Sequence, residues 1–285
     1  MATEPVAKRL RTEEAREAQE AAQQPPPLRD EQQRTTEWYE LRRGCVNASQ
    51  LSKPLGLFQR RDHASGAFDD RERAAFFQQL RDRALDPPLD EDSAEKCAWG
   101  TANESLVLAC YQQLRGDAQP PRDAGSVAHP RFPWLRASPD GLVGDDGLVE
   151  VKCPFKLKDD MPPAEDFVQN GRFRNFWIMP HYLAQMAVQL EVADREWVDH
   201  AVATCHGVRV ERVPRDRVFF QGLMYYIEPF YYAATHNMPL PELTHEDRAR
   251  IRAIFQAHVS KVAAHSAAAR EQHSYLGSHR VENLL

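Results

Sequence analysis

The spacing of apolar positions along the chain predicts helices on both sides of a central block of strands. Apolar side chains recur at helical intervals in residues 37–43, 69–85, 93–114, 180–190, 219–235 and 246–264. Runs rich in β-branched residues, bounded by Gly, Pro and Asp, indicate strands at 126–137, 141–153, 197–204 and 208–213. A further helix is expected to start within residues 47–51. This order predicts an α/β fold with one main mixed sheet flanked by helices.

The two ends of the chain differ from its middle. Residues 1–34 contain few large apolar side chains and a run of three prolines at 25–27, so we expect this segment to be disordered. A single domain is expected over 35–264, followed by a loose polar tail over 265–285. The cluster KRLR at residues 8–11 is either a nuclear import signal or a solvated run of charge.

Composition restricts the setting of the protein. No apolar stretch approaches the roughly 18 residues of a membrane span, and the N-terminus lacks the apolar region of a secretory signal. The five cysteines are odd in number and form no CxxC pair, which disfavours a zinc site or a disulfide framework. We therefore expect a reducing compartment, nucleus or cytoplasm. The net charge of −6 argues against a generally cationic surface but is compatible with a local basic groove.

Candidate chemistry gathers around one predicted hairpin. Asp140 precedes the first strand, and Glu150 and Lys152 lie on the same face of the second, about 6–7 Å apart along it. Two carboxylates and the carbonyl of Val151 are oxygen ligands of the kind that Mg²⁺ prefers. Lys152 would then stand beside a metal-bound water and stabilise charge during attack on a phosphate.

An alternative interpretation of the same residues is purely structural. Asp140 would cap a surface turn, and Glu150 and Lys152 would form an exposed ion pair contributing only about 0–1 kcal/mol. Short patterns of acids and lysines are common, so the hairpin alone leaves both interpretations open.

Four motifs add a resemblance. SPDG at residues 138–141 followed by EVKCPF at 150–155 resembles the PD-(D/E)XK nuclease core, and more narrowly the lambda exonuclease family, also called YqaJ-like viral recombinases. WYELRRGCVNAS at 38–49 resembles the family element W-x3-R-x-G-x3-A-S, although Asn47 replaces a frequent Thr. Residues 98–104 resemble the WG-x3-E helix, and residues 182–185 the Y-x-x-Q helix, with Ala187 where a second Gln is frequent. The matches span residues 36–213.

The resemblance implies roles for individual residues. It implies a restriction-endonuclease-like core in which Asp140, Glu150, Lys152 and Gln185 are catalytic. It also implies that Glu104 joins Asp140, Glu150 and the Val151 carbonyl as a metal ligand.

The resemblance further implies that Arg42 and Ser49 capture a terminal 5′-phosphate, for which the planar fork of Arg and a hydroxyl are suited. Gln185 would hydrogen-bond the attacking water or hold Lys152. His181 and Gln189 share its helix face, but a structural role is expected for both. Four cations that follow the core are weaker candidates for contact with DNA phosphates: Lys156, Lys158, Arg172 and Arg174.

We therefore expect a Mg²⁺-dependent exodeoxyribonuclease, with Mn²⁺ as a substitute ion, that degrades one strand of linear double-stranded DNA from 5′ to 3′ in recombination, repair or viral genome processing. The family resemblance also implies a ring-shaped homotrimer and a single-strand annealing protein as partner. Two alternatives are an alkaline-nuclease-like enzyme that cuts internally or acts on RNA, and a non-catalytic protein that binds DNA ends.

Overall fold

A computed structural model describes residues 33–57, 68–155, 178–204 and 207–281. Its helices are α2 (Thr36–Arg42), the 3₁₀ helix η1 (Ala48–Gln50), α3 (Asp70–Arg81), α4 (Glu91–Arg115), α6 (Pro180–Val192), α7 (Arg217–Thr235) and α8 (His245–Gln272). Its strands are β1 (Val46–Asn47), β2 (Val127–Ala128), β3 (Leu135–Ala137), β4 (Gly141–Val143), β5 (Gly147–Lys152), β6 (Trp197–Thr204), β7 (Gly207–Pro214) and β8 (Gly277–Arg280). The clusters at 8–11 and 156–174 lie outside the described residues.

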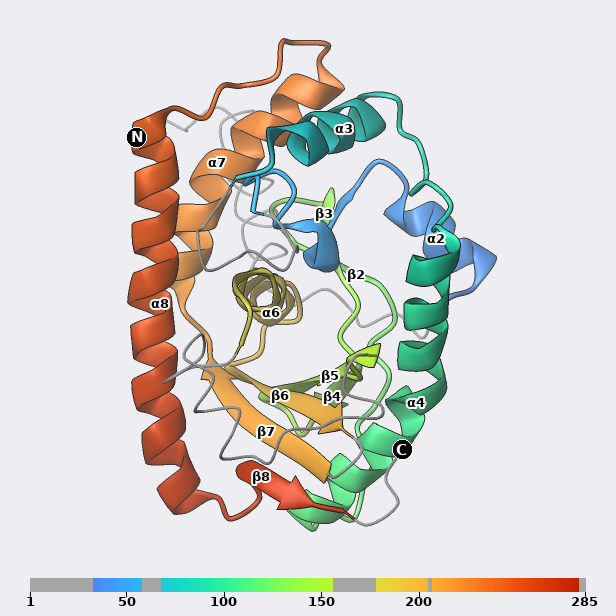
Figure 1. Cartoon of the computed structure of the whole chain (residues 1–285), viewed down its shortest axis with the longest axis vertical. Coiled ribbons are helices and arrows are strands. Elements are labelled where there is room, and N and C mark those ends of the chain that lie inside the picture. The colour runs from blue at the N-terminus through green and yellow to red at the C-terminus, as the bar shows by residue number, and fades with distance from the viewer. Residues whose placement is uncertain (1–32, 58–67, 156–177, 205–206, 282–285) are drawn as a thin grey trace, which may run out of the picture.

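The main sheet is mixed, as the sequence predicts. Its strand order is β4-β5-β6-β7-β8, with β5 and β6 parallel and the other neighbours antiparallel. The sequence pattern does not reveal a smaller sheet of order β1-β3-β2. Helix α6 lies between this sheet and the main one (Figure 1). The helix α6 belongs to the connection between the parallel strands β5 and β6, the arrangement expected of a crossover.

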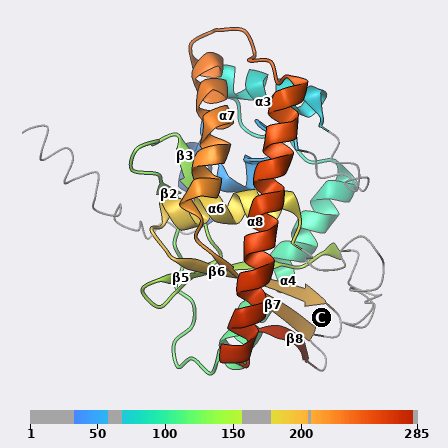
Figure 2. The ribbon, with the colours of Figure 1, turned by 90° about the vertical axis from the view of Figure 1, so that its left-hand side faces the viewer.

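The centre of the molecule is α6, seen end-on in Figure 1 and along its length in Figure 2. It packs against η1, β3, β6 and α7, so neighbours surround it. Nine of its residues are buried: Leu183, Ala184, Gln185, Met186, Ala187, Val188, Gln189, Leu190 and Val192. A helix that is apolar nearly all round is stable only in such an interior position. Among its buried residues, Gln185 and Gln189 are the two polar ones.

The opposite face of the main sheet is covered by α4. Val107 and Tyr111 of this helix share a core with Val149 and Val151 of β5. Val149 and Val151 therefore point into a core, as strand alternation predicts, while Glu150 points toward α6. Two other apolar residues of α4, Cys97 and Leu106, are exposed.

Two boundaries differ from the sequence prediction for local reasons. Residues 47–51 form the end of β1 and a single 3₁₀ turn instead of starting a longer helix. At the start of this turn, Oε1 of Gln50 accepts hydrogen bonds from the backbone N–H and the side-chain amide of Asn47. Residues 126–137 form two short strands, β2 and β3, in place of one. Pro130 and Pro133 lie between them, and proline removes the backbone donor that a continuous ladder requires.

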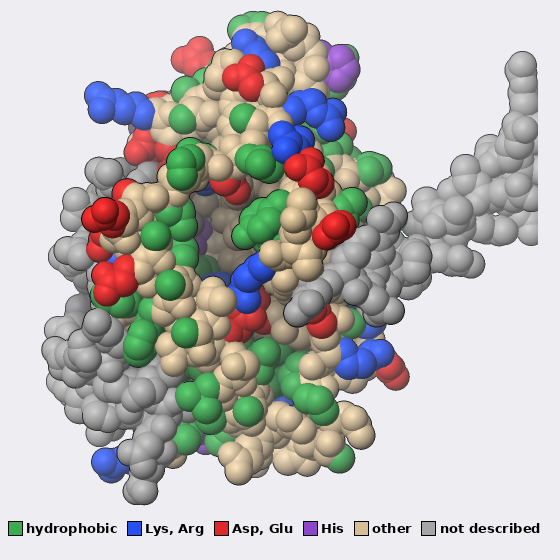
Figure 3. Space-filling view, turned by 90° about the vertical axis from the view of Figure 1, so that its right-hand side faces the viewer, with side chains coloured by type: hydrophobic (Ala, Val, Ile, Leu, Met, Phe, Trp, Pro, Cys, Tyr) green, Lys and Arg blue, Asp and Glu red, His purple; other side chains and the backbone are tan. Residues whose placement is uncertain are grey.

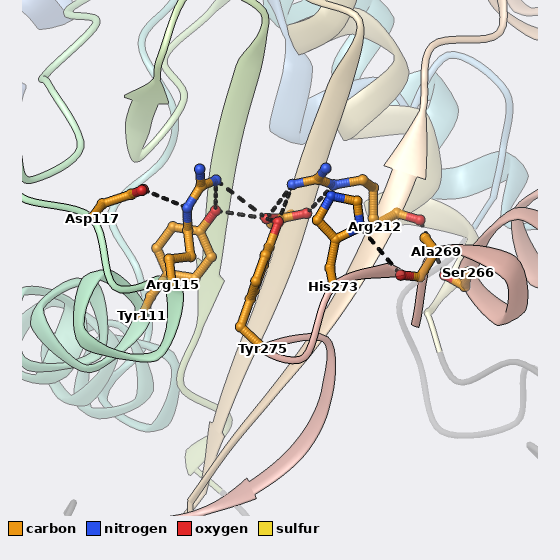
Figure 4. A network of polar contacts seen from close by, with 9 residues as sticks. Tyr111, Arg115, Asp117, Arg212, Ser266, Ala269, His273 and Tyr275 are labelled. Atoms are coloured by element: carbon orange, nitrogen blue, oxygen red, sulfur yellow. Dashed lines mark hydrogen bonds and ion pairs between the residues drawn. The ribbon is translucent and has the colours of Figure 1, made fainter. Parts of the chain in front are cut away.

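Residues 265–281 belong to the fold instead of forming part of a loose tail. Helix α8 continues to Gln272, and β8 pairs with β7. Figure 4 shows the polar network that holds this end. Buried Asp199 of β6 accepts hydrogen bonds from Tyr111 (2.7 Å), Tyr275 (3.2 Å) and Arg212 (2.8 and 3.0 Å). The polar composition of the tail concealed this, because its anchor, Tyr275, binds partners distant in sequence.

Within the described ranges, the helices lack the combination of length and apolar character needed to cross a bilayer. Cys45, Cys97, Cys110 and Cys153 are free thiols.

Candidate active site

A pocket of about 640 Å³ opens between α2, η1, α4, β5 and α6. Figure 3 faces the side on which α2 and α4 lie and shows the surface hollowed near its centre, with charged side chains at the edge of the hollow. All the sequence-predicted site residues line this pocket: Arg42, Ser49, Glu104, Asp140, Glu150, Val151, Lys152 and Gln185. They come from five helices and strands and from the turn before β4, spread over more than 140 positions of sequence, and only the tertiary fold brings them together.

Asp140 is fixed by the hairpin itself. It follows Pro139 and precedes β4, whose Gly141 pairs with Val149 of β5. Its Oδ2 accepts a hydrogen bond of 2.7 Å from the backbone N–H of Val151. Burial raises the pKa of Asp140 well above its ordinary value, and the charges of Glu150 and Glu104 add to this effect, while Lys152 and the Val151 N–H oppose it. Crowded negative charge of this kind favours a cation in the pocket.

Glu150 is buried, with 1% of its surface exposed. Its Oε1 accepts hydrogen bonds from the ammonium of Lys152 and from Nε2 of Gln185, the latter at 2.5 Å. Its Oε2 accepts one from Nε2 of Gln189 at 2.6 Å. Because α6 covers this face of β5, and because both carboxylate oxygens of Glu150 accept hydrogen bonds, Glu150 and Lys152 are not an exposed surface pair.

Lys152 is a cation held between acids. Burial lowers the pKa of its ammonium, but the charges of Glu150 and Asp140 raise it by more, so the net shift is upward. The ammonium also lies 5.0 Å from the centre of the Tyr182 ring. Lys152 is therefore protonated at neutral pH and is suited to stabilise negative charge instead of accepting a proton.

Glu104, on α4, reaches the same pocket but binds another partner. Its Oε2 lies 2.5 Å from the guanidinium of Arg34, in the turn before α2. The neighbouring Gln33 donates a hydrogen bond of 2.9 Å to the carbonyl of Pro139. The segment at the start of the described chain thus lies against the pocket, and Arg34 neutralises the third carboxylate.

Arg42 forms part of a second corner of the pocket. Its guanidinium lies 3.9 Å from the centre of the Trp38 ring and donates a hydrogen bond of 3.4 Å to Oγ of Ser138. The same Oγ accepts a hydrogen bond of 3.0 Å from Nε1 of Trp38. Burial lowers the pKa of Arg42 to about 10; the charge of Asp86 opposes this lowering, and that of Arg136 adds to it. Because the pKa is still well above 7, the side chain stays charged at neutral pH. Ser49 of η1 lines the same pocket.

Some residues at the site were not assigned a functional role from the sequence. Arg34 carried no family motif, and its position follows only from tertiary packing. Gln189 was expected to be structural, yet it binds Glu150 directly. Its signal was the four-residue spacing from Gln185, which places both amides on one helix face. His181 does not line the pocket and instead contacts the ring of Tyr182.

The donor chemistry of the pocket fits a hard divalent cation. Asp140, Glu150 and Glu104 offer carboxylate oxygens, and Val151, whose carbonyl is the fourth expected donor, lines the same pocket. In the described part of the chain, no three carboxylate, imidazole or thiol groups lie close enough together to bind one ion in their present positions. The ion pair of Glu104 with Arg34 is one reason, and this carboxylate would have to exchange Arg34 for the ion.

The sequence profile of the YqaJ-like viral recombinase domain matches residues 37–196, more than half of the chain. The chain belongs to this family. It is similar in structure to an alkaline exonuclease, LHK-Exo, from Laribacter hongkongensis, with a TM-score of 0.52 and 20% identity over 82% of this chain and 99% of that one. The structure of LHK-Exo in complex with dAMP gives a TM-score of 0.51 and 22% identity over the same shares. No curated protein matches the chain.

The YqaJ-like chain shares the fold of these solved structures, a mixed sheet flanked by helices. The family resemblance and the mixed sheet expected from the sequence are both confirmed.

Proposed function

We propose that this YqaJ-like protein is a metal-dependent exodeoxyribonuclease that degrades one strand of linear double-stranded DNA from a 5′ end. The observation that carries the proposal is the convergence in one pocket of Asp140, Glu150 and Lys152 with the cationic corner at Arg42. The solved relatives support it, because LHK-Exo is described as an exonuclease and has been solved with a mononucleotide, dAMP.

The metal proposed here is Mg²⁺, with Mn²⁺ as a substitute. Asp140, Glu150, Glu104 and the Val151 carbonyl would hold it. When bound, such an ion supplies Lewis-acid stabilisation of phosphate charge and lowers the pKa of water toward neutrality.

The chain's own residues complete the chemistry. Water attacks the phosphorus in line, the P–O3′ bond breaks, and a 3′-hydroxyl leaves. Lys152, protonated beside Glu150, stabilises the charge that develops on the phosphate oxygens. Gln185 donates a hydrogen bond from its amide to Oε1 of Glu150 and so helps to hold this acid beside Lys152.

Polarity would be set at the other corner of the pocket. Arg42 is cationic, and stacking on Trp38 and the hydrogen bond to Ser138 pre-orient its guanidinium fork. Together with the hydroxyl of Ser49 it would receive a terminal 5′-phosphate. A DNA end held there would lie with its first linkage toward the carboxylates, which selects ends over internal sites.

The decisive test is digestion of a linear duplex that carries a 5′-phosphate at one end only, with Mg²⁺ or with EDTA, comparing wild type with Asp140→Asn. Mononucleotides released from the phosphorylated end, only with metal and only with Asp140, are expected. Circular duplex DNA and a labelled RNA duplex serve as parallel substrates.

Each alternative function predicts a different result in the same assay. Cleavage of the circular duplex or of RNA would indicate the broader alkaline-nuclease-like activity. Binding of ends without cleavage in any metal would indicate an end-binding protein and overturn the proposed catalysis.

Partners of the chain are proposed from the family resemblance alone. DNA ends are the substrate, a single-strand annealing protein would receive the exposed strand, and a homotrimer would encircle the duplex. Light scattering during gel filtration at assay concentration tests the trimer, and a monomeric mass would contradict it.

A further inference from the structure

Gln189 is the one side chain of α6 that binds Oε2 of Glu150 among the described contacts. Lys152 and Gln185 both donate to the other oxygen, Oε1. Contacts at one oxygen leave a carboxylate able to turn about its terminal bond, whereas contacts at both oxygens fix its plane. The 2.6 Å hydrogen bond from Gln189 therefore determines the orientation of the Glu150 carboxylate.

The position of Gln189 follows from helix geometry. At 3.6 residues per turn, a residue four positions after Gln185 lies only about 40° around the helix from it, whereas position 187 lies about 160° away from it. Ala187 is accordingly buried in the core on another side, with Leu183 and Met186 among its neighbours in that cluster. A side-chain amide at position 189 therefore reaches the carboxylate of Glu150 on β5, whereas one at position 187 would point away from it.

The chemistry of an amide suits this task. Gln189 is fully buried and uncharged, and it lines the pocket. A donor without charge orients Glu150 but leaves the negative charge of the carboxylate available to a cation. A second Lys or an Arg in its place would neutralise that negative charge. The Oε1 atom of Gln189 is itself buried without a hydrogen-bond partner in the described structure. A polar atom in this state is costly, so the hydrogen bond from Nε2 to Glu150 is the polar contact that this side chain makes at the site.

We propose that Gln189 is a positioning residue that, with Gln185, fixes the plane of the Glu150 carboxylate for binding of the divalent cation. The inference deepens the proposed function and rests on it. It assigns a role that neither the family motif nor the spacing of the core motif indicates.

The test is direct binding of Mn²⁺, measured by calorimetry on the full chain without DNA, for wild type and Gln189→Met. Methionine matches the length of glutamine and fills the buried site but donates no hydrogen bond. Partners that orient metal ligands typically contribute about 10–100-fold in metal affinity, and a loss of this size is expected. The KM for duplex DNA should stay within about twofold of wild type, because phosphate binding lies at Arg42, whereas the half-saturating Mn²⁺ concentration should rise.

The control is Val192→Ala, a buried change on the same helix at a residue that does not line the pocket. It should lower the melting temperature and leave Mn²⁺ affinity unchanged. If Gln189→Met does not fold, Gln189→Asn replaces it, since it keeps an amide but is one methylene too short to keep the hydrogen bond and should also weaken Mn²⁺ binding.

The outcomes separate the two proposals. Wild-type Mn²⁺ affinity in a folded Gln189 variant would overturn the positioning role, including the case in which only the melting temperature falls. A wild-type protein that binds no Mn²⁺ and cleaves no DNA would overturn the proposed function, and the role of Gln189 with it.

Discussion

The guanidinium of Arg34 and the carboxylate of Glu104 form an ion pair of 2.5 Å at the wall of the candidate active site. Arg34 belongs to the turn before α2 and Glu104 to the middle of α4, so two separate elements meet there. Glu104 is an expected metal ligand, and a cation already bound to it opposes a second one. The pair therefore sets the ease with which this carboxylate accepts a metal ion.

Removing Arg34 should strengthen metal binding. For Arg34→Ala we expect Mn²⁺ affinity two- to fivefold higher, since a partly exposed ion pair is worth only about 0–1 kcal/mol. Calorimetric titration of the full chain measures this. Arg43→Ala is the matched control, because Arg43 pairs with Glu40, which does not line the pocket. Weaker Mn²⁺ binding by Arg34→Ala would show that the pair supports the site instead of competing for it.

Removing the ammonium of Lys152 should slow chemistry and not binding. Lys152→Met is expected to lower the single-turnover cleavage rate about 10²–10³-fold, the usual cost of losing one group that stabilises transition-state charge. Lys96→Met tests another lysine that lines the pocket but pairs with Asp92, and it should change the rate far less. Equal rates for Lys152→Met and wild type would remove Lys152 from the mechanism.

Replacing the fork of Arg42 should reduce discrimination between DNA ends. Arg42→Lys keeps the charge but loses the planar pair of donors and the stacking on Trp38. The ratio of cleavage rates on 5′-phosphorylated and 5′-hydroxyl duplexes should fall about tenfold, as expected for the loss of one charge-assisted hydrogen bond. Arg43→Lys is the neighbouring control. An unchanged ratio would place phosphate recognition elsewhere.

His129 should make the fold sensitive to acid. Two backbone N–H groups, of Arg131 (3.1 Å) and Phe132 (3.3 Å), donate to its Nδ1, which must therefore be unprotonated. Burial lowers the pKa of His129 to about 4, with Arg131 and Arg215 adding to this effect and Glu191 opposing it. The unfolded chain, with a pKa near 6.5, binds a proton first as the pH falls.

The free energy of unfolding should thus decline between pH 6.5 and about 4, by an amount that approaches about 3 kcal/mol for this residue. Urea denaturation across this range should show a smaller decline for His129→Asn than for wild type. His245→Asn, at an exposed position, should match the wild-type decline. Parallel curves for wild type and His129→Asn would contradict the assignment.

Breaking the buried ion pair between Asp199 and Arg212 should destabilise the whole domain. Asp199→Asn leaves the guanidinium of Arg212 buried without its acid, which typically costs about 3–5 kcal/mol. Urea denaturation measures the change. Asp117→Asn is the control within the same network (Figure 4), because its pair with Arg115 is partly exposed and should contribute less than about 1 kcal/mol. Similar losses in both variants would argue against a special role for burial.

Local sequence patterns predict most of the long elements and the hairpin that carries the core motif. Apolar spacing identified the long helices and the strands β6 and β7 to within a few residues, except that α8 proved longer. Local turn residues identified the β4–β5 hairpin that carries Asp140 and Glu150. These features depend on neighbours close in the chain, so their pattern is visible without a fold.

Only the tertiary structure decided which side chains meet. The burial of Glu150 depends on α6 crossing its strand, and the ion pair of Arg34 with Glu104 depends on α2 approaching α4. The small sheet and the anchored C-terminal strand likewise depend on partners distant in sequence. Local periodicity carries no record of such contacts, so the hydrogen bond from Gln189 to Glu150 could not be predicted from the sequence.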